Sequence, residues 1–201
     1  MSSFVPRILI PILTLLLPGQ TNWFASNFSV VGSIYPRNIL LFFWVFITGM
    51  YFHRTAKQII GQAAFFFPTE KEQVLTDLAV VLFIGSACLP YLPQTLPTIA
   101  FLHLIMAFSS TVIFFTVLTS LNLKLYRIKP KLFSLPTALL IVAITVSSVL
   151  LILCDFLITS ALEIFLALFA CHWIHLFSQR VIHLNKLYQL ELEQSIQNTT
   201  T

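Results

Sequence analysis

The chain has very few charged residues, and this scarcity excludes most classes of soluble protein. Only 9% of its 201 residues are Asp, Glu, Lys or Arg, whereas 58% are hydrophobic and 20 are phenylalanine. A soluble domain carries about 25% charged residues. A bilayer is the solvent in which so apolar a chain can fold, and the composition therefore predicts an integral membrane protein.

Several familiar functional motifs are also missing. The sequence has no GxSxG, HExxH, P-loop or dinucleotide-binding fingerprint, so it indicates none of the common soluble enzyme classes. Its three cysteines, Cys88, Cys154 and Cys171, lie in apolar runs without a CxxC pair, which predicts buried free thiols. The net charge of +4 comes from basic residues dispersed in short loops, so we expect no nucleic-acid partner.

The sequence does contain six apolar runs, each close to the roughly 20 residues that cross a bilayer. Proline opens the second and fourth runs, and S/T-x-x-E capping boxes at 69–72 and 160–163 open the third and sixth. We therefore predict an all-α, polytopic transmembrane helical bundle of six spans over residues 1–184. A polar cytoplasmic tail, expected to fray, follows over 185–201. The spans are expected at 4–24, 36–52, 74–89, 97–123, 134–158 and 160–183.

Two segments need a choice between alternatives. The Met1–Trp23 stretch resembles a signal peptide, but its Pro18–Thr21 segment has no small-x-small cleavage pattern, so we expect a retained first span. The segment His53–Pro68 combines aromatic and basic residues. It either lies in the plane of the lipid headgroups or extends the second helix.

The basic residues predict the orientation of the chain. With the N-terminus inside, ten of the eleven Lys and Arg residues fall on the inner side, and Arg37 alone falls outside. This is the positive-inside pattern, and it places both termini in the cytoplasm. The membrane would be the plasma membrane of a bacterium, or a secretory-pathway or lysosomal membrane of a eukaryote.

Polar residues near the outer side are the candidates for function, because ionisable groups in membranes are costly and usually serve a purpose. Four ionisable residues from four different spans lie near the outer ends of their helices, and the first outer loop adds polar side chains. The predicted binding residues are Arg37, His103, Asp155, Glu163, Asn27 and Ser29.

Each ionisable residue of this set also has a purely structural interpretation. Glu163 can cap its helix, and Arg37 can extend to the headgroups. His103 can serve in packing through a hydrogen bond. Asp155, a carboxylate expected one turn inside a span, needs a partner, and we predict an ion pair or a shared hydrogen-bond network with Arg37.

The sixth span contains residues that could suggest a metal site. His172 and His175 share one helical face, and Cys171 is close in sequence. Zinc needs three or four protein ligands, and no acidic residue lies at this depth. We therefore expect no metal and no other cofactor, and we interpret the histidines as interhelical hydrogen-bonding residues.

The layout resembles the DRAM/Sfk-like membrane proteins and related bacterial proteins of unknown function. The similarity rests on six spans, on Ser29-Val30-Val31-Gly32 before the second span, on His103 early in the fourth, and on Glu163 opening the sixth. Val30 departs from the pattern, because bacterial relatives often carry an acidic residue there. The resemblance implies a non-transporting or lipid-associated membrane protein. Eukaryotic relatives are linked to GPI-lipid remodelling and to autophagy at lysosomes.

These observations lead to one functional hypothesis and two rivals. The first is a non-catalytic membrane protein whose outer polar pocket binds a lipid headgroup or a partner protein, with membrane lipids as its main partners. Arg37 would bind an anionic group there. One rival is an intramembrane lipid hydrolase or lipid-modifying enzyme that uses His103 and Asp155 as acid and base. The other is a small transporter or transporter subunit.

Overall fold

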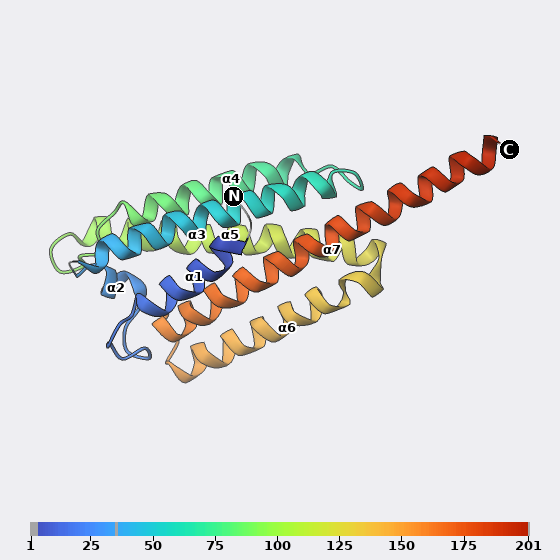
Figure 1. Ribbon diagram of the computed structural model, residues 1–201. Coiled ribbons are helices and arrows are strands. Elements are labelled where there is room, and N and C mark those ends of the chain that lie inside the picture. The colour runs from blue at the N-terminus through green and yellow to red at the C-terminus, as the bar shows by residue number, and fades with distance from the viewer. Residues whose placement is uncertain (1–3, 35, 201) are drawn as a thin grey trace.

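The computed structural model describes residues 4–34 and 36–200, and positions 1–3, 35 and 201 of the predicted segments lie outside it. Within the described residues the chain forms seven helices and no strand (Figure 1). The predicted all-α class is confirmed. The helices are α1 (Phe4–Leu16), α2 (Phe28–Gly32), α3 (Arg37–Ala63), α4 (Glu70–Ala87), α5 (Pro97–Ile128), α6 (Pro130–Leu153) and α7 (Ser160–Thr200).

Four of the described helices, α3, α5, α6 and α7, are long and apolar enough to cross a bilayer. The helices α3 to α7 lie alongside one another, and successive ones run in opposite directions (Figure 1). Large apolar side chains such as Ile141, Val142 and Ile152 of α6 are more than half exposed on the outside of the bundle. Lipid, and not water, is the environment that suits such a surface, so this is a helical membrane bundle.

The first predicted span, 4–24, is too long. Helix α1 ends at Leu16, because Pro18 and Gly19 follow and Gly19 has a φ of +57°. Its 13 residues cover about 20 Å at 1.5 Å per residue, less than the ~30 Å hydrocarbon layer. The chain then turns back through the short helix α2. The six-span count and the side of each terminus therefore stay predictions.

The helices α3 and α7 are both longer than predicted. Helix α3 runs without a break to Ala63, so the helix-extension alternative for 53–68 is confirmed as far as that residue. Helix α7 continues through the polar residues 185–200, which were expected to fray, and extends beyond the rest of the bundle (Figure 1). The sequence of the tail lacks proline and glycine, so nothing in it ends the helix.

Neither predicted capping box forms. Thr69 precedes α4 but makes no side-chain cap bond, and Glu72 pairs with Lys124 of α5. At α7 the residue before the helix is Thr159, one position earlier than predicted, and Glu163 bonds to another segment. In both cases the acidic side chain has a partner on a different element, which replaces the local contact.

Two apolar clusters form the core. The larger one includes Leu121, Phe133 and Phe177, and it joins α1, α3, α5, α6 and α7. The smaller one includes Leu17, Phe28 and Trp44 and lies at the end of the bundle where α2 is found, here called the α2 end. The candidate site is at the α2 end. Of the cysteines only Cys171 is buried; Cys88 is exposed and Cys154 is half-buried, so the prediction of three buried thiols is wrong.

Candidate functional site at the α2 end

The segment before α2 is attached to the first turn of α7. The amides of Ser160 and Ala161 donate to the carbonyls of Ser26 at 2.6 Å and Trp23 at 3.0 Å. The first amides of a helix have no carbonyl of their own helix to donate to. The loop between α1 and α2 supplies carbonyl acceptors for two of these amides. These two hydrogen bonds hold the loop against the start of α7.

Two of the predicted binding residues hold α2 itself. Oε2 of Glu163 accepts the backbone N–H of Phe28 at 2.6 Å, which links α7 to the first residue of α2. Asn27 is the N-cap of α2, because its Oδ1 accepts the amide of Val30 at 2.8 Å. The Phe28 ring, 3% exposed, packs edge-on against Trp44 of α3 with 5.2 Å between ring centroids. Glu163 therefore stabilises a contact between two helices and does not cap its own helix.

Two further predicted residues, Ser29 and His103, are in direct contact. The Ser29 hydroxyl and Nε2 of His103 lie 2.8 Å apart. Nδ1 of His103 lies 2.8 Å from the carbonyl oxygen of Ser86 and 2.9 Å from that of Leu89. Carbonyls only accept, so in the neutral ring Nδ1 carries the hydrogen and donates it. Nε2 then accepts the hydrogen of the Ser29 hydroxyl. This tautomer is assigned from the network of partners.

A largely apolar cavity, here called the bundle cavity, lies next to this pair. Its volume is about 240 Å³, and residues of α2, α3, α4, α5 and α7 line it. An engineered cavity of about 150 Å³ already binds benzene, so this one has room for a larger apolar group. Glu163, Ser29 and His103 supply polar groups to its wall, while Phe52, Phe83 and others supply apolar surface.

Thr48 also lines the bundle cavity, and it was not singled out from the sequence. Its side chain is 1% exposed, and its hydroxyl has no hydrogen-bond partner among the described residues. A buried hydroxyl without a partner costs about 1–3 kcal/mol. A threonine within an apolar helix has no distinctive sequence signal, since it usually bonds to its own helix backbone.

A second hollow, here called the loop cavity, adjoins the bundle cavity and shares Ser29 and His103 with it. Its volume is about 490 Å³. Residues of α2, the start of α3 and the segment after α4 line it, and they include Ser33, Asn38 and Tyr91. Ser29 and His103 line both cavities. The pair therefore lies where an apolar cavity inside the bundle meets a more polar one among the loops.

The remaining two predicted residues, Arg37 and Asp155, do not join this site. Helix α6 ends at Leu153, so Asp155 lies in an exposed turn with a φ of 52° and not inside a span. The Arg37 guanidinium packs against Gly19. Neither residue lines either cavity, and no ion pair among the described residues joins them. The predicted pair is wrong, because a carboxylate in an exposed turn needs no buried cation.

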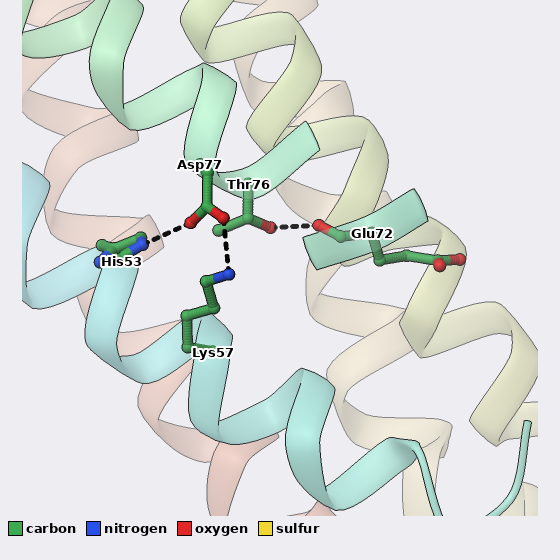
Figure 2. Close-up of polar contacts among 5 residues, drawn as sticks. All are labelled: His53, Lys57, Glu72, Thr76 and Asp77. Atoms are coloured by element: carbon green, nitrogen blue, oxygen red, sulfur yellow. Dashed lines mark hydrogen bonds and ion pairs between the residues drawn. The ribbon is translucent and has the colours of Figure 1, made fainter. Parts of the chain in front are cut away.

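A second polar cluster joins α3 to α4 (Figure 2). Asp77 of α4 lies 2.7 Å from Nε2 of His53 and accepts a hydrogen bond from Nζ of Lys57 at 2.7 Å. The Glu72 carboxyl points away from this group and pairs with Nζ of Lys124 at 2.5 Å. Sequence reasoning missed Asp77. A sequence signal for an acidic partner was available, because His53 and Lys57 are four residues apart and so present two basic side chains on the same helical face.

One of the histidines of α7 has a partner on α1. Nε2 of His175 lies 2.7 Å from Nη1 of Arg7 in α1, an interhelical hydrogen bond of the kind expected for this residue. Among residues 4–34 and 36–200, no group of three His, Cys, Asp or Glu side chains could hold a metal ion.

Comparison with protein-family models, with curated proteins and with solved structures finds no match to this chain.

Proposed function

We propose that this protein binds an amphiphilic lipid, with the lipid's apolar chain in the bundle cavity and its headgroup in the loop cavity. The observation that carries the proposal is the junction of the two cavities at Ser29 and His103. An amphiphile has one apolar and one polar part, and the two adjoining spaces differ in the same way. A ligand site of this type is mostly apolar with a few placed polar groups.

The unpartnered hydroxyl of Thr48 supports the same proposal. It lines the bundle cavity, and a polar atom of a bound molecule would remove the cost of leaving it unpaired. The headgroup differs from the anionic group expected from the sequence, because Arg37 lines neither cavity. We propose a headgroup that is bound through hydroxyl, amide or imidazole contacts, for example by Ser33, Asn38 and His103.

The proposal also includes the topology and the family. Helix α4 and the segment 4–24, of which α1 is the helical part, would complete six crossings with both termini in the cytoplasm, and the α2 end would face away from it, as the distribution of Lys and Arg favours. Ser29, His103 and Glu163, the positions that carry the resemblance to the DRAM/Sfk-like proteins, all line the bundle cavity. A membrane-protein partner remains part of the hypothesis.

Lipid retention through purification tests the proposal. Ala107 lines the bundle cavity, whereas Ala138 is exposed on α6. Protein purified in mild detergent should carry a lipid that is enriched over the bulk membrane lipids, measured by mass spectrometry after extraction. Ala107→Phe should abolish that enrichment because the added ring occupies the cavity, and Ala138→Phe should preserve it. A wild-type lipid profile equal to the bulk membrane, or equal retention by both variants, would overturn the proposal.

A further inference from the structure

We propose that Ser29 and His103 act as a nucleophile and its general base, which cleave an ester bond of the bound lipid. This inference rests on the proposed function, since it requires an ester-linked amphiphile in the two cavities. It assigns a hydrolytic activity to a site that the sequence favoured as non-catalytic. Ser29 also replaces Asp155 as the partner of His103, because Asp155 lies outside the site.

The first argument is the geometry of the pair. A serine nucleophile and its base lie about 2.6–3.2 Å apart, and a third group orients the base. Here the Ser29 hydroxyl lies 2.8 Å from Nε2 of His103, and the carbonyls of Ser86 and Leu89 orient the ring through Nδ1. This tautomer leaves the lone pair of Nε2 pointing at the hydroxyl hydrogen. It is the arrangement that proton abstraction from Ser29 requires.

The second argument concerns the charge that develops on the ring. When His103 takes the proton, the imidazole becomes positive. Ser86 lies in the last turn of α4, where backbone carbonyls carry the partial negative charge of the helix dipole, and Leu89 follows two residues after the helix ends. These carbonyls offset the positive ring, the part that a carboxylate plays in a Ser-His-Asp triad.

The third argument is the position of the pair relative to the lipid. In an ester lipid the carbonyl carbon joins the acyl chain to the headgroup side. With the chain in the bundle cavity and the headgroup in the loop cavity, that bond lies where the cavities meet, beside Ser29 and His103. Water for the second half of the reaction enters through the loop cavity, whose wall includes Ser33 and Asn38.

The reaction then has two balanced halves. Oγ of Ser29 attacks the ester carbonyl carbon while its proton passes to Nε2 of His103. The bond from that carbon to the alcohol oxygen breaks, and the alcohol leaves with the proton from Nε2. Water next attacks the acyl-Ser29 carbon and gives its proton to Nε2. The bond to Oγ breaks, Oγ regains the proton, and a free fatty acid is released.

The same contacts also have a structural interpretation, in which Ser29 and His103 only attach α2 to α4 and α5. The covalent reactivity of Ser29 distinguishes the catalytic interpretation from the structural one. The purified full-length protein is incubated with an alkyl fluorophosphonate, and peptide mass spectrometry locates the adduct. Ser33, four residues away and exposed in the loop cavity, is the internal control. We expect the adduct at Ser29 and none at Ser33.

Variants complete the test. Ser29→Ala should abolish labelling, and His103→Gln should slow it by roughly 10²-fold or more, the usual contribution of a general base. Thermal stability and retained lipid are measured on each variant, so that misfolding is recognised. Asn27→Ala removes the cap of α2 but neither reacting group, so it should slow labelling less than His103→Gln does. If it were as slow as His103→Gln, a role in positioning α2 would account for both.

The outcomes distinguish this inference from the proposed function. Retained lipid without an adduct at Ser29 overturns the activity and leaves lipid binding intact. An adduct at Ser29 in a protein that retains no lipid supports the reactive pair and counts against lipid binding. An adduct whose rate does not depend on His103 overturns the assignment of the base.

Discussion

Substitution of Glu163 tests how α2 is held in place. Oε2 of Glu163 is the acceptor for the backbone N–H of Phe28, at 2.6 Å. Glu163→Leu removes the acceptor and leaves a buried N–H without a partner, at a cost of about 1–3 kcal/mol. Glu163→Gln keeps a carbonyl oxygen at the same place. The leucine variant should therefore be less stable than the glutamine variant by about 2 kcal/mol.

Thermal unfolding in one detergent measures this difference. For a chain of this length 1 kcal/mol shifts Tm by about 2–4 °C, so Glu163→Leu should melt about 4–8 °C below Glu163→Gln. Fluorescence of Trp44 reports on the region, because its ring packs against Phe28. Equal Tm values for leucine and wild type would refute the proposed contact. Equal losses for the leucine and glutamine variants would show instead that an amide oxygen does not replace the carboxyl oxygen in this contact.

Three further predictions concern the rest of the chain. In a thiol-free background, Gln94→Cys should react with an impermeant maleimide from outside the cell and Lys129→Cys only after permeabilisation; labelling of the latter in intact cells would exclude the proposed topology. Asp155→Val should lower the unfolding free energy by about 1–2 kcal/mol, because β-branched residues disfavour positive φ, whereas Asp155→Asn should be neutral; equal stabilities would contradict the turn. Lys124→Ala should destabilise by about 1–3 kcal/mol, since the largely buried Glu72 loses its cation, and adding Glu72→Gln should recover part of this loss; strictly additive losses in a thermal assay would exclude the pair.

The helices were largely predictable, and their ends were not. The starts of α3 and α5 follow from apolar runs that proline opens, a local property of the sequence. The end of α6 at Leu153 was missed by five residues, because the turn that follows is itself apolar. The hydropathy pattern does not distinguish a helix from an apolar turn. That error placed Asp155 inside a span and led to the wrong pair with Arg37.

The candidate site was predicted in part. Asn27, Ser29, His103 and Glu163 were singled out from their depth and polarity, and all four lie on or against α2. Their specific contacts were not predictable. Glu163 matched a local capping pattern, yet its side chain bonds to Phe28, 135 residues earlier in the chain. A local sequence pattern does not contain information about a partner that is distant in the sequence and comes close only in the folded chain.

The sequence by itself determined the class of this protein, because scarcity of charge and runs of apolar residues are constraints that the bilayer imposes on every residue separately. The tertiary structure decided which polar groups meet. Helix packing placed Ser29 against His103, left the Thr48 hydroxyl in the wall of a cavity, and separated Arg37 from Asp155. These outcomes depend on the rotation and depth of each helix relative to its neighbours. Such quantities arise from the packing of whole surfaces, and a one-dimensional pattern does not contain them.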